Sequence, residues 1–183
     1  DDIAVTATSI RATSICLGKD GRPVRDAVVW LDNRRATNLP PMPAKSRMAC
    51  KVAGLTSAIE TIRNNMACNW IIQNEPEVWA KTHKFIVLSA YLNLRFCGNL
   101  VDSTANTVGV VPYDSKTRTW MPASDIRRCL YLLEDDKLID LVEPGEKIGV
   151  ITAEASGQTG IPEGVPYVVT GADKACETLG LSC

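Results

Sequence analysis

The sequence predicts a mixed α/β domain with strands towards both ends and helices between them. Short runs rich in β-branched residues lie near the N-terminus, apolar residues at helical spacing fill the middle, and "GVPYVVT" at 164–170 forms an apolar run near the C-terminus. The 183 residues are enough for one domain with a sizeable core. With 45% apolar and 22% charged residues, the composition is that of an ordinary globular protein.

The N-terminal part is expected to form strands. Residues 3–8 ("IAVTAT") alternate and are rich in β-branched types, and "ATSICL" at 12–17 has strand length. "GKDG" at 18–21 indicates a turn, and "AVVW" at 27–30 predicts a third strand. Three short strands with tight links favour an antiparallel portion of a sheet.

Helices are expected in the middle of the chain. After a proline-rich loop at 39–43, a first helix is predicted over 57–73 by apolar residues spaced three and four apart, namely Ile59, Ile62, Met66 and Trp70. Pro76 suits the first turn of a short second helix. The same spacing predicts a further helix over 85–96, with Gly98 as its stop, from Phe85, Leu88, Leu92 and Phe96.

Beyond that helix the pattern returns to strands. Residues 106–114 are strand-like, 114–120 suggest a turn and 123–133 a helix. Strands are then predicted over 147–155 and 164–170, the second apolar enough to be central and buried. Gly171 follows, and a last helix extends to about residue 180.

Composition excludes several classes of function. A formal net charge of −1 implies no nucleic acid partner. The sequence contains no run of about 18 apolar residues, which is what a membrane span would need. The stretch "DDIAVTATS" lacks a basic region followed by an apolar run, so no secretory signal is expected in it. Seven scattered cysteines without a CxxC motif predict neither a zinc site nor a disulfide framework. A reducing, cytoplasmic location is therefore expected. The only histidine, His83, restricts histidine-based catalysis to one position.

Asp173, at the start of the last helix, has two interpretations. Thr170 and Asp173 have the spacing of a capping box, in which the threonine caps the helix and the acid reaches back. Alternatively, the carboxylate follows the carboxyl end of a central strand, where open α/β sheets place their ligands. The residues alone leave both open.

Four stretches together resemble the FGGY family of carbohydrate kinases, in the same order along the chain. One spans a hairpin and a W-x-D-x-R segment with Trp30, Asp32 and Arg34, and another is "WIIQNEPEVW". The third, "HKFIVLSAYLNLRFCGNLVDSTANTVGVVPYDSKTRTW", contains a D-x-S/T turn. The last is "EGVPYVVTGADKACETLG", in which Asp173 matches the catalytic base of the family.

The resemblance implies an α/β fold of the ribonuclease H-like (actin-like ATPase) type, with a mixed sheet flanked by helices. It implies transfer of the γ-phosphoryl group of ATP, with Mg²⁺, to a sugar or polyol hydroxyl. Asp173 would be the general base, and the substrate-binding residues would be Ile10, Arg11, Asp173 and Lys174.

Alternative interpretations remain for the residues around Asp173. Arg11 could be a surface strand residue, and Lys174 a solvated helix residue. Asp32 and Arg34 could pair and hold a turn rather than bind substrate. Trp70 is most simply a core residue.

Departures from the family pattern limit what this chain is expected to do. No D-x-G-T phosphate hairpin and no glycine-rich phosphate loop occur, and Ala67 and Cys68 stand where a lysine is usual before Trp70. Residues 1–183 are therefore expected to form an incomplete N-terminal, sugar-binding domain that is inactive alone, with no ATP, Mg²⁺ or other metal bound to this chain. An unpaired sheet edge makes a homodimer possible. The rival interpretation is a non-catalytic sugar-sensing or scaffolding relative.

Overall fold

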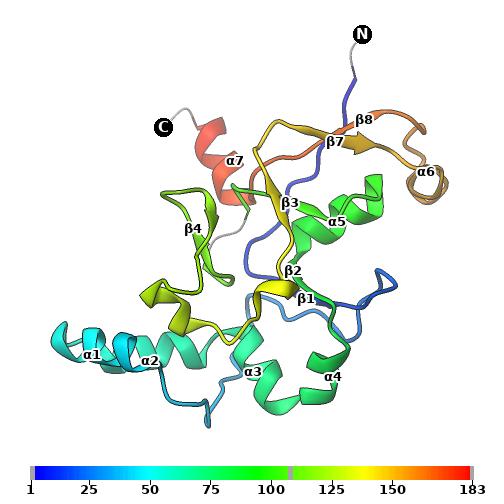
Figure 1. Ribbon diagram of the computed structural model, residues 1–183. Coiled ribbons are helices and arrows are strands. Elements are labelled where there is room, and N and C mark those ends of the chain that lie inside the picture. Colours follow the sequence, from blue (N-terminus) through cyan, green and yellow to red (C-terminus); the bar gives the residue numbers. More distant parts are fainter. Residues whose placement is uncertain (1–2, 107–108, 182–183) are drawn as a thin grey trace.

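The computed structural model describes residues 3–106 and 109–181. Its strands form small pairs of both directions, surrounded by helices (Figure 1), so the fold is mixed α/β as predicted. The antiparallel pairs are β1 (Ser14–Leu17) with β2 (Lys84–Val87), β4 (Tyr113–Asp114) with β5 (Thr119–Trp120), and β7 (Lys147–Val150) with β8 (Pro166–Val168); the parallel pair is β3 (Val101–Ser103) with β6 (Asp140–Val142).

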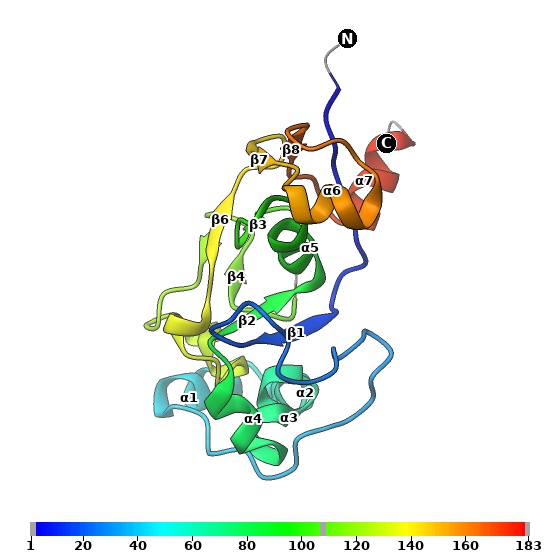
Figure 2. The same ribbon diagram turned by 90° about the vertical axis from the view of Figure 1, so that its right-hand side faces the viewer.

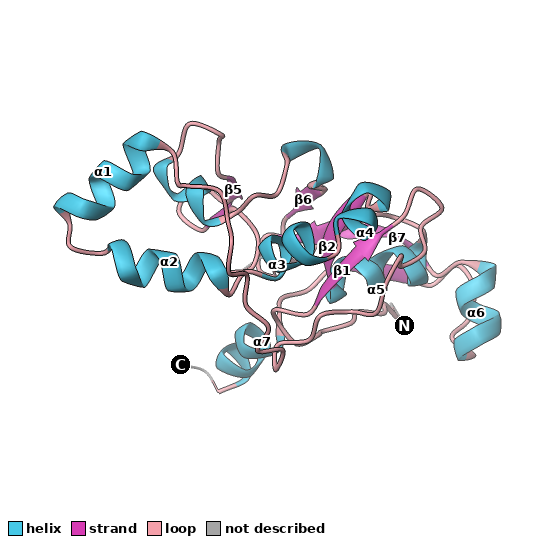
Figure 3. Cartoon of the chain, turned by 90° about the horizontal axis from the view of Figure 1, so that it is seen from below, coloured by secondary structure: helices cyan, strands magenta, loops and turns pink. Residues whose placement is uncertain are grey.

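Helices occupy much of the rest of the described chain. The α-helices are α1 (Ala44–Val52), α2 (Thr56–Asn64), α3 (Ala67–Asn74), α4 (Pro76–Lys81), α5 (Leu88–Cys97), α6 (Ala153–Thr159) and α7 (Asp173–Gly180). Two short 3₁₀ helices are η1 (Ile126–Leu130) and η2 (Asp135–Lys137). Seen from below, α1 and α2 project from one side of the molecule (Figure 3). None of the helices in the described ranges is long and apolar enough to cross a membrane.

Of the three strands predicted near the N-terminus, only the second is a strand, β1, whereas residues 3–8 and 27–30 contribute one isolated bridge each. Val28 forms an antiparallel bridge with Ser14 of β1, as expected for neighbouring strands. Residues 3–8, however, do not pair with β1. Val5 instead forms a parallel bridge with Tyr167, which places β8 between the N-terminal segment and β7. The C-terminal strand predicted over 164–170 is thus shorter, β8, but it lies between two partners and its Tyr167 is fully buried, as predicted.

Two of the helix predictions need correction. The helix expected over 57–73 is broken between α2 and α3, and its stripe is misplaced, because Ile62 is 41% exposed while Arg63 and Ile71 are buried. Phe85 lies in β2, not in a helix, because it pairs with Cys16 of β1. A short apolar run fits a buried strand as well as a helix, so spacing alone could not decide this.

Three of the remaining predicted elements are shorter in the structure than expected. The helix expected over 123–133 is reduced to η1, whose first turn is capped by Asp125. The strand expected over 147–155 ends at Val150, because Thr152 caps α6. Gly98 ends α5 in a left-handed conformation, as predicted. Of the strand expected over 106–114, β4 covers only the last two residues, and residues 107–108 lie outside the described chain.

The β1–β2 pair is packed on both faces, which fixes the register of the strands. Cys16 and Phe85 face the main core beside α3 and α4, whereas Ile15, Leu17 and Ile86 face Ala90 of α5; Figure 2 shows these helices on opposite sides of the pair. A third cluster joins α5 and α6 to β8 through Cys97, Ile151, Ala155 and Tyr167. Alternate side chains of a strand point to opposite faces, so a slip by one residue would exchange the two cores.

Candidate active site

The turn between β8 and α7 is tied to the N-terminal segment by hydrogen bonds. The backbone N–H of Asp173 donates to the carbonyl of Ser9 at 3.1 Å, and the hydroxyl of Thr8 donates to the carbonyl of Gly171 at 2.7 Å. An added Cβ at Gly171 would lie 3.1 Å from the Cβ of Ala175, so the turn leaves little room for a side chain there. These contacts bring the first residue of α7 beside residues 8–11.

The capping-box interpretation of Thr170 is wrong. The N-cap residue of α7 is Ala172, and no side chain caps the helix. The hydroxyl of Thr170 lies 3.7 Å from Sγ of Cys176 instead. The carboxylate of Asp173 does not reach back to Thr170. Among the described residues, the hydrogen bond that it accepts comes from the N–H of Lys174 to Oδ1, at 2.7 Å.

Asp173 lines an open pocket, as the active-site interpretation requires. Its side chain is 31% exposed, and Nε of Arg11 lies 4.0 Å from Oδ1. The pocket has a volume of about 490 Å³ and is lined by Ile10, Arg11, Ala12, Trp30, Asp173 and Lys174. The structure thus brings all four residues of the sequence prediction to one pocket, although they come from opposite ends of the chain.

Arg11 and Lys174 differ in how free they are to meet a ligand. In the described chain, Arg11 has no charged partner nearer than Asp173. Nζ of Lys174 donates to Oε2 of Glu177 at 2.7 Å, one turn along α7, and this bond raises the pKa of the lysine. Lys174 therefore fits both interpretations of this residue, as a solvated helix residue and as a substrate-binding residue, because it lies on the solvated surface of α7 and also borders the pocket.

Two lining residues were not selected from the sequence as site residues. Trp30 is 61% exposed, which is unusual for a large aromatic side chain, and it borders the Asp173 pocket. Ala12 has a φ of 63°, a left-handed conformation that is costly for a residue with a Cβ. Strain of this kind is common at functional sites. Only the W-x-D-x-R pattern pointed towards Trp30, and no sequence signal marked Ala12.

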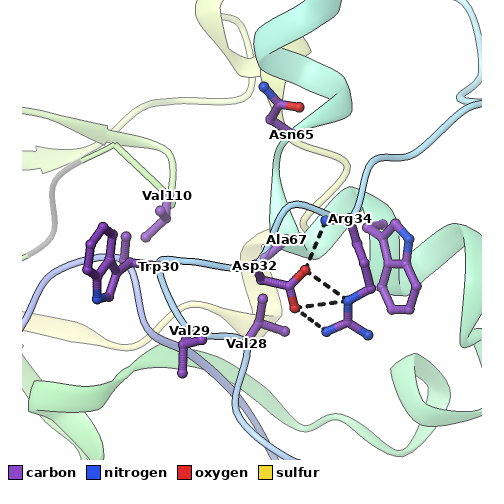
Figure 4. A pocket seen from close by; sticks show the side chains of 10 residues that line it. Val28, Val29, Trp30, Asp32, Arg34, Asn65, Ala67 and Val110 are labelled. Carbon is purple, nitrogen blue, oxygen red and sulfur yellow. Dashed lines mark hydrogen bonds and ion pairs between the residues drawn. The ribbon is translucent and has the colours of Figure 1, made fainter.

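A small adjoining pocket explains the W-x-D-x-R segment. Figure 4 shows Asp32 turned towards Arg34 and away from Trp30. Nε of Arg34 donates to both carboxylate oxygens at 2.9 Å, which lowers the pKa of Asp32, and the guanidinium lies 4.0 Å from the ring centre of Trp70. The expected structural pairing of Asp32 with Arg34 is confirmed. Trp70 is half-buried: it packs against the main core, and the guanidinium of Arg34 lies over its ring.

A buried acid supports the turn that carries Asp173. Asp102 is 0% exposed and accepts hydrogen bonds from Oγ of Ser89 at 2.8 Å, the N–H of Ser103 at 2.8 Å and Nδ2 of Asn106 at 3.1 Å. Burial raises the pKa of Asp102 to about 6, against the effect of these donors. Asn106 also donates to the carbonyl of Thr170 at 3.1 Å. Asp102 is therefore linked to the site through Asn106.

Comparison with known proteins identifies the family of the chain. Residues 2–180 match the N-terminal domain of the FGGY family of carbohydrate kinases. A xylulose kinase of Lactococcus lactis subsp. lactis (strain IL1403) is 24% identical over 91% of this chain and 32% of its own length. An autoinducer-2 kinase of Enterobacter sp. (strain 638) is 31% identical over 71% of this chain and 23% of its own length.

Solved structures share the fold. A gluconate kinase from Lactobacillus acidophilus superposes with a TM-score of 0.71 at 22% identity, over 98% of this chain and 36% of that protein. A ligand-bound xylulose kinase from the same organism also gives 0.71, at 22% identity, over 96% of this chain and 35% of that protein. The chain thus spans about a third of the length of these structures, and the fold predicted from the resemblance is confirmed. The chain belongs to the FGGY family of carbohydrate kinases.

Proposed function

We propose that the protein carrying this chain is an ATP-dependent kinase of a sugar or polyol, with Asp173 as its general base. The observation that carries the proposal is the position of the Asp173 carboxylate. Asp173 is the first residue of α7, and its side chain lines a pocket of about 490 Å³ opposite Arg11. Pockets of this size suit a small ligand. Family membership supports the reaction class.

The chemistry requires one proton acceptor at the attacking hydroxyl. An alcohol holds its proton until the bond from oxygen to phosphorus forms, so a carboxylate placed beside it accelerates transfer by roughly 10²–10⁴-fold. The rest of phosphoryl transfer depends on placement and charge neutralisation. Asp173 is proposed to take the proton, while its helix and the Ser9 contact hold it in place.

The remaining lining residues are proposed to bind and orient the substrate. The N–H groups of Arg11 and Lys174 can donate to hydroxyl oxygens. Trp30 offers an exposed apolar ring, and Ile10 and Ala12 complete the wall. These residues shape the pocket, and only Asp173 is given a part in the proton transfer.

ATP is proposed as the phosphoryl donor, with Mg²⁺ as its counter-ion. Among the described residues, no group of three histidine, cysteine or acidic side chains is placed to hold a metal ion. No step at the metal is therefore assigned to these residues, and the nucleotide is proposed to be held by other parts of the protein. The chain alone is proposed to be inactive.

Asp173→Asn tests the assignment of the base in the full-length protein. The variant should lose at least about 100-fold in phosphoryl transfer while its sugar affinity, measured by calorimetry, stays within about threefold. Asp136→Asn, at an exposed acid within η2, is the matched control and should retain full activity. A fully active Asp173→Asn variant would remove the proposed base. A wild-type protein that binds sugars but never transfers phosphate would instead support the sugar-sensing relative.

A further inference from the structure

A second large pocket lies on the part of the molecule formed by α1, α2 and η1. Its volume is about 690 Å³, and its walls come from residues 40–46, from Arg63 of α2 and from residues 123–132. None of its lining residues lines the pocket of Asp173. The proposed kinase reaction uses no part of it.

Arg63 is a buried cation on this wall that contacts no carboxylate of the described residues. Burial lowers the pKa of Arg63, and Glu60, one turn earlier in α2, raises that pKa less strongly. The exposed fraction of Arg63 is 5%, and its Nε donates to the carbonyl of Cys129 at 2.9 Å. No carboxylate in residues 3–106 or 109–181 lies within 4.0 Å of its guanidinium, and its other four N–H groups have no acceptor there. Burying an unpaired charge is costly, so an anionic partner is expected.

The N-terminus of α1 opens into the same pocket. Pro43 precedes the helix and offers no side-chain cap, and the first turn contains no acidic residue. The backbone N–H groups of Ala44, Lys45 and Ser46 have no acceptor among the described residues, although all three residues line the pocket. Uncapped N–H groups and the positive end of the helix dipole favour an anion.

The other charges of the wall add to this preference. Lys45 and Arg128 also line the pocket, and the single acid, Asp125, is paired with Arg127. Nη2 of Arg128 is paired with Asp135, while its buried Nη1 has no hydrogen-bond partner in the described part of the chain. The positive charges of the wall thus outnumber the negative.

We propose that this pocket binds a small oxyanion, a metabolite with a phosphate or carboxylate group, between Arg63 and the N-terminus of α1. The guanidinium would donate two parallel hydrogen bonds to the anion, and the backbone N–H groups of α1 would bind its other oxygens. The site is separate from the proposed sugar pocket and does not depend on the kinase assignment.

Thermal unfolding of the protein that carries this chain tests the site, with inorganic phosphate and citrate as probes and sodium chloride to hold the ionic strength constant. At least one probe should raise the unfolding temperature with a saturable dependence on concentration. A response to phosphate alone assigns a phosphorylated ligand, and a response to citrate alone a polycarboxylate. Arg63→Met should weaken the apparent affinity about tenfold or more.

Two controls separate this site from other causes. Arg22→Met removes the same charge from an exposed turn and should keep the full response. Ser124→Asp adds a negative charge at the exposed rim of the pocket and should weaken binding even if Arg63→Met fails to fold. The proposal is overturned if neither probe gives a saturable response. It is also overturned if Arg11→Met abolishes the response and Arg63→Met or Ser124→Asp does not, since the anion would then occupy the Asp173 pocket.

Discussion

Replacing Asp102 by asparagine should remove a pH-dependent loss of stability from this protein. Asp102 is completely buried and receives one hydrogen bond at Oδ2 and two at Oδ1. Asparagine has the same shape, its oxygen can accept the bonds from Ser103 and Asn106, and its amide can donate to Ser89. The substitution therefore changes the titration of the site and little else.

The expected magnitude follows from the pKa of Asp102 in the folded state. Burial raises that pKa from 3.8 to about 6, so the folded protein holds this proton more tightly than the unfolded chain does. The resulting stabilisation is fully present below about pH 4 and is lost as the pH rises through about 6. A shift of about two pKa units corresponds to about 3 kcal/mol of unfolding free energy.

Urea unfolding of Asp102→Asn and the wild type between about pH 4 and pH 7.5 measures this effect. The two proteins should differ by less than about 1 kcal/mol at the acid end, and the variant should gain about 3 kcal/mol relative to the wild type at the alkaline end. Other acids cancel in the difference. Ser89→Ala, which removes a donor that lowers the pKa of Asp102, should move the transition to higher pH. A difference that is flat across this range, or that falls with pH, would refute the reasoning.

Two further substitutions test the strain at the pocket and the packing of β8. Ala12→Gly relieves a left-handed conformation that costs about 1–2 kcal/mol, but the glycine also adds chain entropy to the unfolded state, which costs about 0.4–1 kcal/mol. The variant should therefore be more stable by about 0.5 kcal/mol in urea unfolding. A loss of stability would show that Ala12 is not strained. Tyr167→Phe removes the buried hydrogen bond, 3.2 Å long, from the tyrosine hydroxyl to Oδ1 of Asn93. The free energy of unfolding should fall by about 1–2 kcal/mol, and the unfolding temperature should fall with it. An unchanged unfolding temperature would show that Asn93 finds another donor.

The family, and four of the residues that line the Asp173 pocket, could be predicted from the sequence because both depend on short segments. The run around Tyr167 is apolar on both faces, Gly98 ends a helix by its left-handed conformation, and Asp173 begins a helix after a buried strand. The resemblance added Ile10 and Arg11, whose proposed role is to bind the substrate. These features are local, so a reader of the chain can recognise them without knowing which segments meet.

The pairing of distant segments could not be predicted in this way. Val5 bridges to β8 and not to β1, and Phe85 enters a strand because a partner strand and two packed helices surround it. Both outcomes depend on the burial gained by each pairing, which no local pattern records. The oxyanion pocket was missed for the same reason, since Arg63 has the sequence neighbours of an ordinary surface helix residue.

The sequence by itself determined the α/β composition, the main boundaries between helices, strands and loops, and the position of one acid at the start of the last helix. The tertiary structure alone decided that Arg11 and Trp30 line one pocket with that acid, that Asp102 supports its turn, and that Arg63 is buried beside the N-terminus of α1. The physical reason is that propensity and spacing act over a few residues, whereas the charge and shape of a pocket arise where segments from opposite ends of the chain are packed together.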